Sequence, residues 1–129
     1  MFTIMVVDDS PMTLTLVTGL IEDCATFETK VMSFNNPVYA QQEFHRINPD
    51  FVITDIVMPG VDGYEFIDFV KSQKNIPILA ISGSYVEENS PHTLLYCAKK
   101  LGADFSLSKK EIGTKLPSLV TEIFLQYNT

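Results

Sequence analysis

The sequence has no tryptophan, only two cysteines, and nine basic residues against sixteen acidic ones. Cys24 and Cys97 lack CxxC spacing, so we expect isolated core thiols in a reducing, cytoplasmic setting rather than a disulfide framework. The formal charge of −7 opposes nucleic-acid binding through a basic face. No stretch approaches the ~20 apolar residues of a membrane span, and no positive segment of a signal peptide precedes the first apolar run. Disulfide scaffolds, general nucleic-acid binders and membrane proteins are therefore excluded as classes.

The composition is that of a folded domain. Hydrophobic residues make up 46% of the 129 residues and charged residues 19%, with no low-complexity stretch. A chain of this size is expected to form one core. Residues 1–129 are therefore predicted to be a single globular domain.

Short apolar runs alternate with longer segments of helical period. The runs are continuous, which is typical of parallel strands buried on both faces, and they predict strands at 4–7, 30–34, 51–54, 78–81 and 105–107. The segments between them carry apolar residues three and four positions apart and predict five helices. Together they indicate an α/β fold, a single doubly wound (βα)5 domain with a parallel five-stranded sheet.

Proline, serine and glycine mark several helix ends. Ser10-Pro11 and Ser90-Pro91 each offer an N-cap followed by proline at the first helical position. Asn48-Pro49 is expected to end the second helix, and Gly102 to cap the fourth. Pro117 is expected to interrupt the last helix, at 112–126, early in its course.

Polar side chains follow four of the five predicted strands. In an open parallel sheet, ligands bind at the carboxyl ends of the strands, near the point where the strand order reverses. The second strand ends at residues 34–36 with no comparable group, as expected for an edge strand in the order 2-1-3-4-5. The candidate site residues at the other strand ends are Asp8, Asp9, Asp55, Ser82 and Lys109.

Three carboxylates in one pocket require positive charge to neutralise them. Lys109 and a divalent cation would supply it, and Mg²⁺ is the natural candidate because it prefers a few carboxylates plus water and phosphate oxygens, with Mn²⁺ a plausible substitute. Asp55 stands alone at its strand end, so it is the best-placed nucleophile for forming an acyl phosphate. Taken singly, each residue could also be a helix-start, turn or surface residue.

At these residues the chain resembles the response-regulator receiver domain of two-component signalling, a flavodoxin-like fold. The matching motifs cover essentially the whole chain: V-V-D-D-S at 6–10, D-I-V-M-P-G-V-D-G at 55–63, I-S-G at 81–83 and G-A-D-F-S-L-S-K at 102–109. The resemblance implies that Asp55 is the phosphoacceptor. The phosphoryl group would come from a histidine kinase or a histidine phosphotransfer protein, and any catalysis would be limited to self-catalysed phosphorylation and dephosphorylation.

The resemblance also implies the roles of the surrounding groups. Asp9 and Asp55 would ligate Mg²⁺ directly, Asp8 mainly through water, and the backbone carbonyl of Val57 would complete the protein ligands. The family's hydroxyl and lysine positions fall on Ser82 and Lys109, which would bind the phosphoryl oxygens and couple them to the distal face.

Output is expected through a downstream protein. The chain ends about three residues after the predicted last helix, so we expect no output domain, and signalling by protein contact as a monomer or phosphorylation-linked dimer. The contact face would be formed by the fourth helix, the fifth strand and the last helix.

The chain departs from the family pattern at three places. Lys110 stands where a proline usually follows the lysine, which predicts a trans bond and a different aim for Lys109. Ser106 stands at the position of the aromatic switch residue. The segment from Ser82 to Lys109 is longer than usual, and its Tyr85 is a candidate substitute for the aromatic ring.

Val57 carries a further hypothesis. Its side chain would lie near the line of attack of hydrolytic water, and an apolar branched group offers that water no hydrogen bond. We therefore predict a long-lived phosphoryl group.

Three alternatives stay open at this point. A flavodoxin-like cofactor carrier would need phosphate-cradling residues where the chain has Asp8-Asp9. A haloacid-dehalogenase-like phosphatase would need a second aspartate where Val57 stands. The runner-up is a degenerate receiver that acts as a phosphorylation-independent interaction module, which the departures at Lys110 and Ser106 favour.

Overall fold

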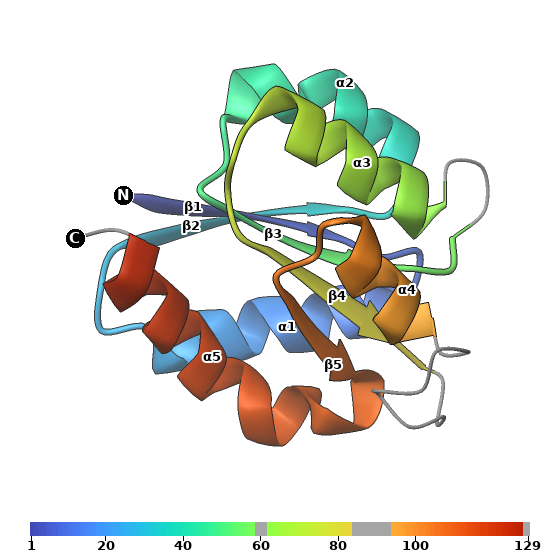
Figure 1. Cartoon of the computed structure of the whole chain (residues 1–129). Helices are drawn as coiled ribbons and strands as arrows, with labels where there is room; N and C mark the ends of the chain where they lie inside the picture. Colours follow the sequence, from blue (N-terminus) through green and yellow to red (C-terminus); the bar gives the residue numbers. More distant parts are fainter. Residues whose placement is uncertain (59–61, 84–93, 128–129) are drawn as a thin grey trace.

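The computed structural model describes residues 1–58, 62–83 and 94–127 (Figure 1). Strands and helices alternate along the chain, as predicted. The elements are β1 (Phe2–Val7), α1 (Pro11–Cys24), β2 (Thr29–Phe34), α2 (Pro37–Ile47), β3 (Phe51–Asp55), α3 (Gly63–Gln73), β4 (Ile78–Ser82), α4 (Leu94–Leu101), β5 (Phe105–Ser108), the short 3-10 helix η1 (Lys109–Glu111) and α5 (Ile112–Tyr127).

All strands are parallel and lie in the order β2-β1-β3-β4-β5, which confirms the predicted fold class and strand order. Helices α2, α3 and α4 lie on one face of the sheet, and α1 and α5 lie on the other (Figure 1). Because both faces are covered, β3 and β4 are buried at every residue. This burial explains why their sequences are continuous apolar runs.

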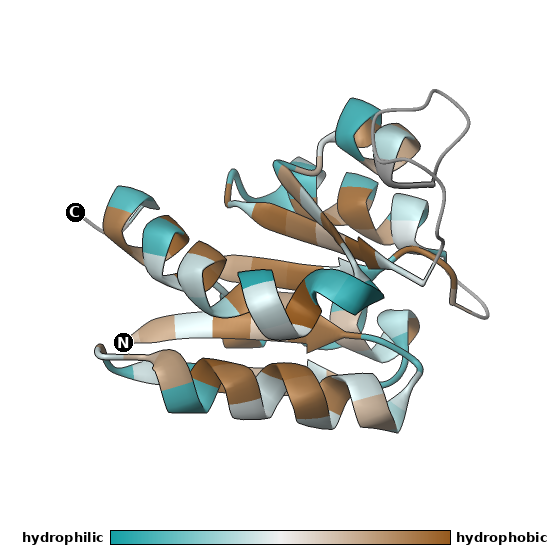
Figure 2. Ribbon diagram, turned by 90° about the horizontal axis from the view of Figure 1, so that it is seen from below, coloured by the Kyte–Doolittle hydropathy of each residue, from teal (hydrophilic) through white to brown (hydrophobic). Residues whose placement is uncertain are grey.

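The sheet separates two hydrophobic layers. One layer joins side chains such as Met5, Val52 and Phe66 beneath α2, α3 and α4. The other joins Ile4, Ile53 and Leu116 against α1 and α5. Figure 2 shows the strands mostly in the hydrophobic colour and the helices striped with hydrophilic residues, as expected for helices that cover a buried sheet.

Most of the predicted helix signals are found at the helix ends. The Ser10 hydroxyl accepts a hydrogen bond from the Thr13 amide (3.3 Å) and Pro11 is the first helical residue. Gly102 follows α4 with a φ of +127°, a backbone conformation that favours glycine, so it caps that helix as predicted. The predicted start at Ser90-Pro91 lies outside the described residues.

The prediction that Pro117 interrupts the last helix is wrong, because α5 runs without a break from Ile112 to Tyr127. A proline inside a helix removes one hydrogen bond, here to the carbonyl of Gly113 four residues earlier. Gly113 is exposed, so water can satisfy that carbonyl. Buried Leu116 and Val120 on either side of Pro117 hold the helix against the sheet.

Four phenylalanines pack together where the strands begin. Phe2 opens β1 and Phe51 opens β3, and the Phe2 ring lies beside those of Phe51, Phe27 and Phe124. The rings of Phe27 and Phe124 stack with centroids 3.7 Å apart, and Phe2 contacts the other three rings. We call these four residues the aromatic cluster.

Two further predictions concern the cysteines and the membrane. Cys24 and Cys97 are both free thiols, as expected, but they are half-buried rather than core residues. Within the described part of the chain, no helix combines the length and apolarity needed to cross a bilayer.

Candidate functional site

The carboxyl ends of four strands bring the predicted site residues to one edge of the sheet. Asp8 and Asp9 follow the last residue of β1, Asp55 is the last residue of β3, and Ser82 is the last residue of β4. Lys109 follows β5 directly. The parallel register pairs Val7 with Thr54, Asp55 with Ile81 and Ser82 with Ser108, so these ends are level with one another.

Three carboxylates form the centre of the site. One ligand oxygen from each of Asp8, Asp9 and Asp55 lies within 4.8 Å of the others. Asp8 is fully buried and Asp55 is 5% exposed, whereas Asp9 is exposed to solvent. The cluster is therefore closed on the protein side and open at Asp9.

Lys109 bridges the two buried carboxylates. Its Nζ lies 3.1 Å from Asp8 Oδ2 and 3.3 Å from Asp55 Oδ2. All peptide bonds of the described residues are trans, in line with the absence of proline at 110, and Lys109 still reaches both acids. The non-prolyl residue at 110 therefore does not remove the lysine from the site.

Backbone amides hold the Asp55 carboxylate in place. Its Oδ1 accepts hydrogen bonds from the amides of Ile56 (2.7 Å) and Val57 (3.4 Å), while Oδ2 accepts one from Lys109. With one oxygen tied to the backbone, the other is fixed towards the lysine. These two anchors could not be predicted from the sequence, because every residue type except proline carries the same backbone amide.

Asp8 is less well satisfied. Its Oδ1 accepts a hydrogen bond from the Ser10 amide (2.8 Å), but its buried Oδ2 finds no directional hydrogen-bond donor among the described residues. The Lys109 ammonium lies 3.1 Å from this oxygen and pairs with its charge. A buried oxygen with spare acceptor capacity therefore faces the site.

The charges in the site shift one another's titration. Burial raises the pKa of Asp8, and the negative charge of Asp55 adds to this, although the Ser10 amide and Lys109 act against it. Burial alone would lower the pKa of Lys109, but the charges of Asp55 and Asp8 outweigh it and raise that pKa. Lys109 is therefore a permanent cation near neutral pH.

The residues present fit a hard divalent cation. All three convergent ligands are carboxylate oxygens, the type that Mg²⁺ and Mn²⁺ prefer. Lys109 offsets one of the three negative charges of the ionised carboxylates. The remaining two would be balanced by one divalent cation. The unsatisfied Asp8 Oδ2 supplies an acceptor that such an ion, or water bound to it, would satisfy.

Four other predicted positions have mixed outcomes. Ser82 is buried at the end of β4 beside the site, and Val57 is 61% exposed at its rim. Ser106 lies buried in β5, where the family places its aromatic ring. Tyr85, the candidate substitute, lies outside the described residues.

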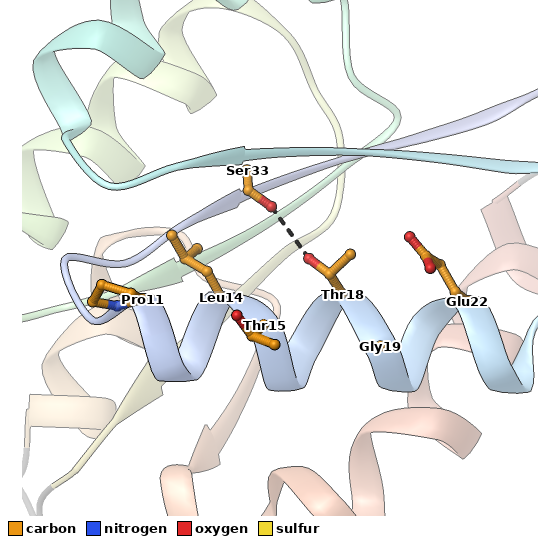
Figure 3. Close-up of a pocket in the computed structure, with 7 residues that line it drawn as sticks. All are labelled: Pro11, Leu14, Thr15, Thr18, Gly19, Glu22 and Ser33. Carbon is orange, nitrogen blue, oxygen red and sulfur yellow. Dashed lines mark hydrogen bonds between the residues drawn. The ribbon is translucent and has the colours of Figure 1, made fainter.

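A groove of about 520 Å³ lies apart from the acidic cluster, between α1 and the edge strand β2. Figure 3 shows the Thr18 hydroxyl pointing to that of Ser33, and the two oxygens are 3.2 Å apart. Glu22 is the one charged residue that lines this groove. Because the described lining of the groove brings no cluster of charged groups together, the strand ends are the better candidate site.

Comparison with known proteins gives a consistent family. The family model described as "Response regulator receiver domain" matches residues 4–121. A protein-glutamate methylesterase/protein-glutamine glutaminase of Leptospira interrogans is 31% identical over 116 residues, which cover 89% of this chain and 32% of that protein. One from Xanthomonas oryzae is 32% identical over 109 residues, 84% of this chain and 29% of that protein. The chain thus spans about a third of the length of these relatives.

Solved structures share the fold. The signal receiver domain of a DNA binding response regulator from Colwellia psychrerythraea superposes with a TM-score of 0.83 at 24% identity, covering 97% of this chain and 99% of that one. The response regulator domain of Thermotoga maritima CheB gives 0.78 at 20% identity, covering 99% and 97%. At these identities the likeness extends to the fold alone.

Proposed function

Because the chain belongs to the response regulator receiver domain family, we propose that it is a phosphoacceptor of a two-component system, with Asp55 as the residue phosphorylated. The donor is the phosphohistidine of a histidine kinase or of a histidine phosphotransfer protein. The observation that carries the proposal is the cluster of Asp8, Asp9 and Asp55 with Lys109 held across two of its members.

Asp55 is the nucleophile in this proposal. In the transfer, a carboxylate oxygen of Asp55 attacks phosphorus, the P–O bond forms, and the P–N bond to the donor imidazole breaks with its electron pair returning to nitrogen. The amides of Ile56 and Val57 fix the carboxylate, so little reorientation is needed. In this proposal Lys109, which pairs with Asp55, offsets the charge of the incoming phosphoryl oxygens, and the Ser82 hydroxyl at the end of β4 donates a hydrogen bond to them.

Mg²⁺, or Mn²⁺ in its place, would neutralise phosphoryl oxygens during transfer. Asp9 and Asp55 are the direct ligands in this proposal, with the Val57 carbonyl, and Asp8 acts mainly through water. The exposure of Asp9 leaves that side open to solvent and to a donor.

We further propose that signalling is by protein contact through the face of α4, β5 and α5, to a downstream partner and without a catalytic reaction on another substrate. The methylesterase activity named for the Leptospira and Xanthomonas relatives is not part of this proposal. A cytoplasmic location is proposed because both cysteines are free thiols, as expected in a reducing compartment.

Intact mass after incubation with acetyl phosphate or phosphoramidate tests the proposal. We expect a labile gain of one phosphoryl group that needs Mg²⁺ and is lost in Asp55→Asn. Asp104→Asn is the matched control, because Asp104 binds Lys71 and the Ile78 amide away from the site. A gain that persists in Asp55→Asn would contradict the proposal.

The phosphorylation-independent interaction module is the second candidate. Buried Ser106 favours it, because this residue has no ring to rotate inward on activation. It would be supported if wild type neither gained phosphate nor bound Mg²⁺ and still bound its partner.

A further inference from the structure

Gly63 is the first residue of α3, and the structure leaves no room for a side chain at this position. A β-carbon built on it would lie closer than 3.0 Å to three backbone atoms: the carbonyl oxygen of Asp55 and the α-carbon and carbonyl oxygen of Ile56. Real side chains essentially never come so close. All three atoms belong to the backbone that carries the phosphoacceptor, so no flexible side chain can move aside.

Backbone freedom does not explain this glycine. The described glycine with a positive φ is Gly102, whereas Gly63 has a conformation that any L-residue adopts. Gly63 is buried and is the first residue of the helix. Close approach is therefore the reason for glycine here.

The close approach joins the start of α3 to the end of β3. The Gly63 amide donates to the Ile56 carbonyl (2.8 Å), which ties the start of α3 to the end of β3. Asp62 caps the same helix by accepting from the Glu65 amide (2.9 Å). The end of β3 and the start of α3 are thus fastened to each other by backbone contact.

We propose that Gly63 is a positioning residue for the phosphoacceptor site. Its missing side chain lets α3 press against the Asp55–Ile56 backbone, and this contact fixes the Ile56 and Val57 amides that hold Asp55 Oδ1. The same contact sets where the Val57 carbonyl lies. The inference rests on the proposed function, because it assigns those groups to Mg²⁺ and phosphoryl binding.

The size of the effect follows from the distances. Relieving a contact this short requires a shift on the order of 1 Å towards ordinary van der Waals separation. A misplacement of that size can slow a positioned reaction by about 100-fold. Because the clash arises at the first side-chain carbon, Gly63→Ser should lose as much as Gly63→Ala.

The test compares wild type with Gly63→Ala and with Gly19→Ala. Gly19 is the matched control because a β-carbon there meets nothing within 4 Å. Mg²⁺ affinity is measured by calorimetry at a temperature where each variant is folded by circular dichroism, and phosphorylation rate by intact mass with acetyl phosphate. We expect Gly63→Ala to bind Mg²⁺ about 10-fold more weakly and to be phosphorylated about 10- to 100-fold more slowly. Gly19→Ala should match wild type in both measurements.

A purely structural role would lower thermal stability and leave the Mg²⁺ affinity of folded Gly63→Ala unchanged, and that result would overturn the inference. If Gly63→Ala does not fold, Asp62→Ala, which loosens the same helix start, takes its place and must weaken Mg²⁺ binding. The proposed function fails separately: in that case wild type itself would neither bind Mg²⁺ nor gain phosphate.

Discussion

The two ends of the parallel sheet are built on opposite principles. At the amino ends of the strands, the aromatic cluster packs Phe2 against three other rings. At the carboxyl ends, Asp8 and Asp55 are buried with one lysine between them, and Asp8 Oδ2 lacks a directional hydrogen bond. Burying rings stabilises the fold, whereas burying like charges costs free energy. The comparison teaches that the candidate site lies at the end of the sheet where buried charge costs free energy, opposite the end that buried rings stabilise.

Truncating the aromatic cluster should give the largest change in stability. Phe2 is fully buried, so we expect Phe2→Ala to lower the free energy of unfolding by about 3–5 kcal/mol in denaturant titration. Mg²⁺ affinity of the folded variant should stay at the wild-type value. The control is Tyr127→Ala, which removes a half-exposed ring and should change stability by less than about 0.5 kcal/mol. If Phe2→Ala and Tyr127→Ala lost equal free energy of unfolding, the aromatic cluster would not be a main source of stability.

Removing the lysine should give the largest change in chemistry. Lys109→Ala takes away the cation that faces both buried carboxylates, and we expect phosphorylation by acetyl phosphate to slow about 100-fold, as for loss of one oriented donor. Exposed Lys110 is the control, and Lys110→Ala should keep the wild-type rate. Equal phosphorylation rates for Lys109→Ala and Lys110→Ala would contradict the proposal that Lys109 neutralises the charge of the site.

Removing the buried negative charge of Asp8 should stabilise the protein. Without Mg²⁺ at neutral pH, we expect Asp8→Asn to raise the free energy of unfolding by roughly 1–2 kcal/mol, because it removes a buried charge with an unsatisfied oxygen. The same change should weaken Mg²⁺ binding. The control Asp9→Asn alters an exposed carboxylate and should stabilise less.

The difference in unfolding free energy between Asp8→Asn and wild type should depend on pH in a defined direction. Burial raises the pKa of Asp8 above its unfolded value, so the ionised carboxylate destabilises the folded protein above the folded-state pKa. As pH falls through that pKa, Asp8 takes up a proton in the folded state and the penalty is relieved. The stability gap between Asp8→Asn and wild type should therefore narrow on acidification. A gap that widens would contradict the assignment.

The smallest expected effect concerns hydrolysis. Val57→Asn places a hydrogen-bonding amide at the exposed rim of the site, and we expect loss of the phosphoryl group to become a few-fold faster by intact mass over time. Val38→Asn is the control, since Val38 is an exposed valine on α2. If Val57→Asn loses the phosphoryl group at the wild-type rate, the hypothesis that Val57 protects it is wrong.

Sequence reasoning reached most of the fold because its signals are local. Apolar runs located all five strands, and the lack of a polar group after β2 agreed with the predicted strand order, which the structure confirms. It failed at Pro117, where packing of Leu116 and Val120 outweighs one lost hydrogen bond. The local sequence pattern does not show how strongly these residues pack against the sheet.

The site was predictable only in part for a similar reason. The acidic residues and Lys109 could be named because their types are informative at strand ends. The amide anchors of Asp55 and the space at Gly63 could not, because they depend on backbone atoms brought together by α3 and β3. Gly63 was visible in the motif after Asp55, but close approach cannot be distinguished from a turn in sequence alone.

The most direct test of the central claim locates the phosphoryl group on the chain. Borohydride reduction of protein treated with acetyl phosphate and Mg²⁺ converts an aspartyl phosphate to homoserine, and peptide mass mapping then identifies the residue. We predict homoserine at position 55, only in samples that contained both reagents. Modification at another carboxylate, or none in protein that binds Mg²⁺, would contradict the assignment of Asp55 as the phosphoacceptor.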